Sequence, residues 1–384
     1  KAMLQNTIYR NFIKELLKTF FVILFGLTII AWTVRAVNFL DLIVDSGYSV
    51  STYFQYSILN LLSIMTKFIP LSFLLALVIF IIKKIQENEF IILWTSGIKK
   101  LTLANLFFAV SIFISIIYLI FSTVITPTAL NKSRFLLNKG GFDSFLPTIR
   151  IQQFSDSFEG FTLLVEDKKN NEINNVFIHD ENNVLKNLTS DQSGKNSTTI
   201  VAKNGIVQGN KKLVLFNGQI ISTQKESLKN NIIKFEQLNI NLDTLSTGTI
   251  KIPKLQETST YELLKCNFQK FFNDTNILNC KKSAEEEIKT ILNRRFVLPF
   301  YIPIISLICS FLIIRPDKKK NLFLNKYTIF IISFLILLYA ELIVRYTGIS
   351  TLINFLFFIS PLILIPIIYV LLIYKLSKES VVIK

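Results

Sequence analysis

Six long apolar runs constrain this chain more than any other feature of its sequence. A helix needs about 20 apolar residues to cross the roughly 30 Å of hydrocarbon in a bilayer. Backbone groups inside a membrane must find partners within their own segment, which favours helices. The sequence therefore predicts a polytopic α-helical membrane protein with six transmembrane helices. The runs cover about residues 20–40, 57–82, 102–125, 296–314, 327–346 and 349–374.

A polar segment between the third and fourth runs divides the chain into three parts. We assign residues 1–125 to an N-terminal transmembrane half, residues 126–295 to a soluble domain and residues 296–384 to a C-terminal transmembrane half. Residues 1–18 are basic and amphipathic, as expected of a helix at the membrane interface. The apolar run behind them is too long for a cleavable signal.

Strand patterns dominate the first part of the soluble domain. Runs such as residues 161–166 and 212–216 cluster apolar residues as strands do. The dipeptides Asn204-Gly205 and Asn217-Gly218 are typical of hairpin turns between such runs. We predict an all-β domain, a sandwich or jellyroll, inserted between helices three and four. It covers about residues 152–251, and a helical connector over residues 261–295 then leads into the fourth span.

Basic residues flank the runs unevenly and indicate an orientation. Lys and Arg gather at both termini and in residues 83–100 and 315–326, whereas residues 41–56 contain two aspartates and no Lys or Arg. The positive-inside rule then places both termini in the cytoplasm and the β domain outside. The net charge of +16 suits an anionic membrane face, so we do not expect a nucleic-acid partner.

Few side chains suit catalysis or metal binding. Cys309 lies in the fourth run and suits packing, while Cys266 and Cys280 lie in the soluble domain and are able to pair in an oxidising compartment. His179 lies in a strand-like run without a cysteine or histidine cluster beside it. The chain lacks the Gly-x-x-x-x-Gly-Lys-Ser/Thr phosphate loop. We therefore expect no catalytic residues, metal or cofactor.

A polar island, residues 83–101, separates the second and third runs. Phe90, Trp94 and their apolar neighbours recur at helical spacing, which predicts a one-sided helix of about two to three turns within residues 84–100. Glu87 and Glu89 suit the start of this helix. Gly97 stands where it should stop. Such a helix is well shaped to receive a push from a soluble partner, although an ordinary interfacial loop helix fits the same residues.

Four ionisable residues fall within the apolar runs, where each needs a partner. Arg35, Lys67 and Arg345 lie at outer-leaflet depth, where a ring of cations suits the phosphates of an anionic lipid. Alternatively, Arg35 and Arg345 snorkel to the interface. Glu341 also stands four residues before Arg345, so the two are placed to neutralise each other.

Two short segments, Asn88-Glu89-Phe90 and Ser96-Gly97-Ile98, carry a family resemblance together with the basic start Ile8-Tyr9-Arg10. Over its whole length the chain resembles the LptF/LptG permeases, the transmembrane subunits of the bacterial lipopolysaccharide export ABC transporter. Asn88 matches the small or polar residue of the family only loosely. The runs that are more similar to the LptF branch cover residues 40–45, 163–166 and 176–180.

The resemblance implies partners and residue roles. The coupling segment of the family docks in a groove of a cytoplasmic ATPase dimer, and its acidic residue falls on Glu89. A family cation that binds the lipid matches Arg35, and spans one and five form a gate against a sister permease. The outer domain is a periplasmic β-jellyroll that passes lipopolysaccharide to a bridge of similar jellyrolls. The chain would then be a multi-pass subunit of the inner membrane whose ATPase activity resides in a partner.

Two other functions remain open from the sequence. A permease for another lipid or a lipoprotein would also move an outer domain, but such proteins carry their large domain after span one. A membrane-anchored scaffold or sensor with a β module would need neither intramembrane bases nor an ATPase partner.

Overall fold

The computed structural model of this chain contains two compact units. One unit comprises Lys1–Thr33, Asn60–Asn131 and Ile252–Lys384, and the other comprises Val34–Leu59 and Lys132–Lys251. The structure describes residues 2–40, 43, 49–139, 149, 151–158, 161–169, 171–181, 196–208, 212–224, 230–241, 254–268, 284–314 and 326–382.

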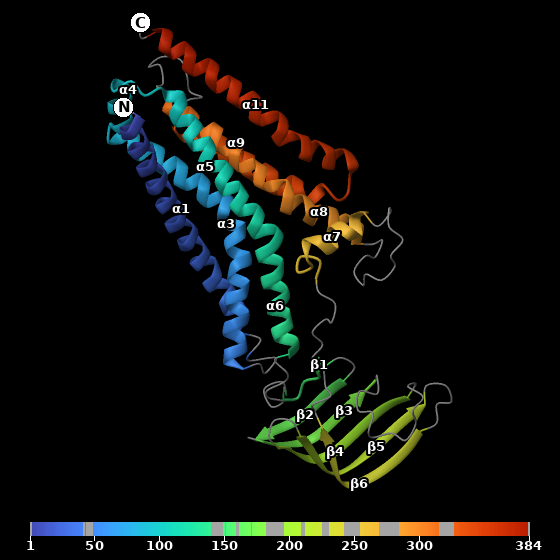
Figure 1. The fold of residues 1–384 in the computed structure, drawn as a ribbon. Helices are drawn as coiled ribbons and strands as arrows, with labels where there is room; N and C mark the ends of the chain where they lie inside the picture. Colours follow the sequence, from blue (N-terminus) through green and yellow to red (C-terminus); the bar gives the residue numbers. More distant parts are fainter. Residues whose placement is uncertain are drawn as a thin grey trace. The chain divides into compact units, whose positions relative to one another are not determined.

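Six stretches of the described helices are long and apolar enough to cross a membrane, which confirms the predicted number of spans. These stretches are Thr7–Asn38, Val50–Gln86, Lys100–Leu137, Glu285–Ile313, Lys326–Tyr346 and Thr351–Ser377. The spans are built from the helices α1 (Ala2–Asn38), α3 (Val50–Gln86), α5 (Lys100–Ile120), α6 (Thr126–Lys139), α8 (Glu285–Phe296), α9 (Tyr301–Ser310), α10 (Lys326–Ile343) and α11 (Thr351–Val382) (Figure 1). Two short helices, α4 (Glu89–Thr95) and α7 (Thr260–Phe268), lie outside them.

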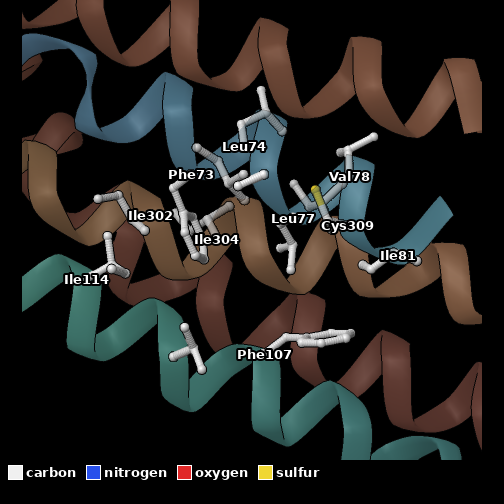
Figure 2. Packing of buried hydrophobic residues seen from close by; sticks show 14 of the residues in the cluster. Phe73, Leu74, Leu77, Val78, Ile81, Phe107, Ile114, Ile302, Ile304 and Cys309 are labelled. Carbon is white, nitrogen blue, oxygen red and sulfur yellow. The ribbon is translucent and has the colours of Figure 1, made fainter. Parts of the chain in front are cut away.

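Helix α9 lies at the centre of the helical unit. All ten of its residues are buried, and it packs against α5, α10 and α11. Figure 2 shows Ile302, Ile304 and Cys309 of α9 between Leu77 of α3 and Phe107 of α5. Helix α9 is therefore enclosed by protein, and its neighbours pack around it.

Prolines interrupt the helix ladders at several depths, and hydroxyl groups replace the missing hydrogen bonds. A proline has no N–H for the carbonyl four residues earlier. Pro299 thus leaves the carbonyl of Arg295 without its usual donor, and Ser122 Oγ donates to that oxygen over 3.0 Å. Pro303 does the same to Pro299, whose carbonyl accepts from Ser115 Oγ at 2.7 Å.

The end of the third span follows the same rule. A π-helical turn, Phe121–Ile125, joins α5 to α6, and Pro127 leaves the carbonyl of Thr123 without a backbone donor. Thr260 Oγ1 donates to this oxygen. Because the lost bond is replaced, the helix continues to Lys139, beyond the end that the apolar run predicts near residue 125.

The second unit contains an antiparallel β-sheet whose strands follow one another in order of sequence. The all-β prediction is confirmed, and the sheet, placed in the sequence between the third and fourth spans, is consistent with a jellyroll-like domain. Its strands are β1 (Ser155–Phe158), β2 (Phe161–Lys169), β3 (Glu172–Asp180), β4 (Asn196–Gln208), β5 (Lys212–Gln224) and β6 (Asn230–Asn241) (Figure 1).

A single crease crosses five of these strands. In each of β2 to β6 one residue is skipped in the pairing, and the skipped residues stand in one row. Side chains alternate in a regular strand, so Ile173 and Val176 of β3 would face opposite sides, yet both are buried in the same core. The crease therefore keeps one apolar face on one side of the sheet. The skipped residues are Glu166, Asn175, Lys203, Asn217 and Glu236.

The prediction that Asn204-Gly205 and Asn217-Gly218 form hairpin turns is wrong. Both dipeptides lie inside strands, at or beside the crease. Asn217 has a left-handed φ of 52° and Asn175 one of 50°. Asparagine tolerates this conformation inside a strand as it does in a turn, so the dipeptide alone does not distinguish the two. Just beyond the crease, burial lowers the pKa of the Lys168 ammonium group.

The proline analysis predicts the effect of Ser115→Ala. The substitution removes one of two donors to the buried carbonyl of Pro299, which also accepts from a backbone N–H at the start of α9, so we expect a loss of about 1 kcal/mol in the free energy of unfolding. Thermal unfolding of the full chain in detergent would measure it. Ser111→Ala is the control, because Ser111 Oγ donates to Phe108 within its own helix, 2.6 Å away. Equal stability of the two variants would contradict the proposed role of Ser115.

Candidate functional site

The candidate site lies at the end of the helical unit that the sequence predicts to face the cytoplasm. Here α3 ends and α4 connects it to α5. Asn88 joins α3 to α4 with a left-handed φ of 58°. Such a residue turns the chain sharply, and asparagine accepts the conformation at lower cost than most residues. A helix is thus present within the predicted residues 84–100, but it is short and covers Glu89–Thr95.

The far end of α4 stops at Gly97, as predicted. Gly97 has a φ of 91° and donates its N–H to Trp94 O over 3.1 Å. Ile98 donates to Leu93 O, also over 3.1 Å. These two bonds form a Schellman motif, which satisfies carbonyls at the end of a helix. With left-handed residues at both ends, α4 is sharply delimited.

The aromatic side of α4 faces the protein rather than the solvent. Phe90 is 1% exposed and meets Phe12 of α1 edge to face, with ring centroids 6.1 Å apart. Trp94 stacks on Phe90, and Lys100 lies over the indole at 4.3 Å. Phe90 and Trp94 therefore hold α4 against the bundle, so Phe90 is not exposed to a partner.

An ion cluster joins α4 to α1 and to the end of α3. Lys84 Nζ lies 2.7 Å from Glu15 Oε2, 2.9 Å from Glu89 Oε1 and 3.8 Å from Glu87 Oε2. Lys83 Nζ lies 3.1 Å from Glu15 Oε1. The cluster contains one more carboxylate than ammonium groups, so its net charge is negative.

The outer side of α4 is exposed and partly apolar. Ile92 is 65% exposed, and the Glu87 and Glu89 side chains are 43% and 40% exposed. A hollow of about 380 Å³ lies beside them. Sequence reasoning missed Ile92, because it belongs to the same short apolar run as the buried residues. The hollow is lined by Ile8, Asn11, Phe12, Glu15, Lys84, Glu89, Ile92 and Leu93.

The predicted lipid-binding cations are exposed but are not brought together within one unit. Lys67 and Arg345 belong to the helical unit, and Arg35 belongs to the second unit. The alternative in which Glu341 neutralises Arg345 is wrong, because Glu341 Oε2 instead lies 3.4 Å from Arg294 Nη2. Arg345 stands in a 3₁₀ turn after α10, which disrupts the regular spacing of a helix.

The remaining candidates have structural surroundings. His179 Nδ1 lies 2.9 Å from Thr199 Oγ1 on the neighbouring strand. Cys309 is a buried free thiol, and Cys266 is disulfide-bonded, whereas Cys280 lies outside the described residues. Within the part of the chain that the structure describes, no group of three or more acidic, histidine or cysteine side chains is placed to hold a metal ion.

Comparison with known proteins agrees with this architecture. The family model described as "Lipopolysaccharide export system permease LptF/LptG" matches residues 10–375, from within α1 to within α11. The chain belongs to the LptF/LptG family. This match does not separate the LptF branch from the LptG branch. The family is described as a permease of the lipopolysaccharide export system.

One curated relative is similar to part of this LptF/LptG family member. It is the "Uncharacterized protein RP871" of Rickettsia prowazekii (strain Madrid E), 28% identical over 211 residues. The match covers 54% of this chain and 57% of the relative, so the chain spans little more than half the length of that protein.

The backbone geometry at Gly97 predicts different hydrogen-exchange protection for two substitutions. Gly97→Ala adds a Cβ where space is open but φ is positive, so we expect about 1 kcal/mol of backbone strain. Hydrogen exchange at the amides of Gly97 and Ile98 should then accelerate about five-fold. Gly97→Asn should preserve most of the protection, because asparagine tolerates a positive φ. Identical exchange in both variants would refute this account.

Proposed function

We propose that this chain is the transmembrane permease subunit of an ABC transporter that extracts lipopolysaccharide from the inner membrane. A separate cytoplasmic ATPase dimer supplies the energy, and a periplasmic bridge receives the lipid. The observation that carries this proposal is α4, a sharply delimited helix between two spans with an exposed acidic and apolar side. Its position in an LptF/LptG family member supports a role in coupling.

The outer side of α4 is suited to a basic and apolar groove on the ATPase. Glu87 and Glu89 supply the excess negative charge of the cluster, and Ile92 supplies apolar area. Opposite charges across an interface steer association and fix its register. Glu89 then faces an Arg or Lys of the ATPase, while Phe90, Trp94 and Gly97 keep α4 in place.

The orientation of the chain is part of the proposal. The basic flanks support cytoplasmic termini and a cytoplasmic α4. With six spans, the β domain then lies in the periplasm. The disulfide at Cys266 supports the same side, since disulfides persist in oxidising compartments such as the bacterial periplasm.

The proposed route of the lipid passes the cationic side chains of the spans and then the β-sheet. Arg35, Lys67 and Arg345 each offer a cation to the phosphates of lipopolysaccharide at the contact with a sister permease. Spans one and five form the gate at that contact. The β domain then passes the lipid to a similar β domain of the bridge through an exposed strand edge.

Loss of the Glu89 charge is expected to weaken ATPase docking. Glu89→Ala should reduce co-purification of the ATPase about ten-fold, which corresponds to about 1.4 kcal/mol. Ile92→Asp should act in the same direction. The control is Glu262→Ala, which removes an exposed carboxylate from the first turn of α7. Full co-purification of the ATPase with Glu89→Ala would exclude this docking role. If the protein is instead a scaffold or sensor, no ATPase should co-purify with the unsubstituted chain either.

Removal of the Arg35 guanidinium is expected to reduce lipid contact. In the assembled complex, Arg35→Ala should lower photo-crosslinking of lipopolysaccharide several-fold, because phosphate loses a charge-assisted donor. Lys18→Ala is the control, since it removes an exposed cation from the opposite half of the same helix. Unchanged crosslinking would show that Arg35 is only an interfacial anchor. Stronger crosslinking to a different lipid would identify that lipid as the substrate.

A further inference from the structure

Lys84 is a buried cation at the meeting point of three helices. Its side chain is 6% exposed, although it lies in the last turn of α3 near the end of the bundle. The ammonium group reaches Glu15 of α1 at 2.7 Å and Glu89 of α4 at 2.9 Å. It also lies over the rings of Phe12 and Phe80, 5.6 and 5.8 Å from their centroids.

The neighbouring Lys83 provides an internal comparison. Its side chain is 53% exposed, and it pairs with Glu15 at 3.1 Å and with Glu87 at 3.9 Å. Water screens such an exposed pair, so it contributes little. Lys84 is shielded by two aromatic rings, and separation from its carboxylates would leave a buried charge without compensation.

Helices α1 and α4 are separated in the sequence by the whole of α3, yet they meet side by side here. Phe12 of α1 contacts Phe90 of α4, and the ion pairs of Lys84 with Glu15 and Glu89 join the same two helices. A displacement of α4 away from α1 would break either an ion pair or the aromatic contact. Movement of α1 together with α4 preserves both contacts.

We propose that Lys84 is a positioning residue that transmits the displacement of α4 to α1, and so carries the energy of the ATPase into the first span. This inference rests on the proposed function. Lys84 contacts neither the lipid nor the nucleotide. Without it, Glu15 and Glu89 face each other across the hollow as like charges, which drives α1 and α4 apart.

The decisive experiment compares Lys84→Met and Lys83→Met in the complete complex reconstituted in proteoliposomes. Lys84→Met should hydrolyse ATP while releasing at least ten-fold less lipopolysaccharide per ATP. Lys83→Met should keep the wild-type ratio. Lys84→Arg should restore most of the ratio, because a guanidinium group also pairs with two carboxylates.

A distance measurement gives a second readout that does not depend on lipid release. Spin labels at Lys14 and Thr95, both exposed, report on α1 and α4 respectively. In the otherwise wild-type complex the distance should stay constant when an ATP analogue binds. In the Lys84→Met complex it should change. Glu15→Gln is the second variant if Lys84→Met fails to fold, and it should reproduce the uncoupling.

The outcomes separate this inference from the proposed function. A wild-type ratio of lipid to ATP in both Lys84→Met and Glu15→Gln would overturn the role of Lys84 and leave the transporter intact. Loss of ATPase binding to the same extent as in Glu89→Ala would also overturn it, since Lys84 would then only shape the docking surface. An unsubstituted complex without ATPase or lipid release would instead refute the proposed function.

Discussion

Hydrogen bonding of the backbone where water is absent is the constraint on which the helical unit depends. Each proline that interrupts a span leaves a carbonyl oxygen without its donor, and burial of that oxygen without a partner is costly. Ser115, Ser122 and Thr260 each donate to one such oxygen from another helix or connector. These serines and this threonine therefore decide where the apolar runs are able to bend. The central helix α9 begins within such a bend and is covered on all sides.

This constraint explains which parts of the fold the sequence could predict. Apolar runs give the spans directly, because length and composition leave few alternatives in a membrane. The β domain was also predictable from its strand patterns. The crease was not, because it depends on five strands that each leave one residue out of the pairing in the same row, while the register stays the same on either side. Asn217 has the left-handed φ that a hairpin turn requires, yet it lies inside β5.

The candidate site shows a similar division between local and tertiary information. Helical spacing and Gly97 predicted where α4 lies and where it ends. The predicted apolar side, which contains Phe90, is buried, and its packing partner α1 is distant in sequence. The exposure of Ile92 was not predicted, because Ile92 belongs to the same short apolar run. Lys84 also looked like any lysine that flanks a span, since only the fold brings Glu15 beside it.

The short helix α4 has two properties that together favour transmission of force. Left-handed residues at Asn88 and Gly97 delimit it, so it is a separate short segment between α3 and α5. Phe90 and the pairs of Lys84 connect it to α1, and these contacts are strongest where water is excluded. The exposed carboxylates on the other side carry the surplus charge. A push on that side would therefore reach α1 through Phe90 and the buried side chain of Lys84, whereas water screens the exposed pairs of Lys83.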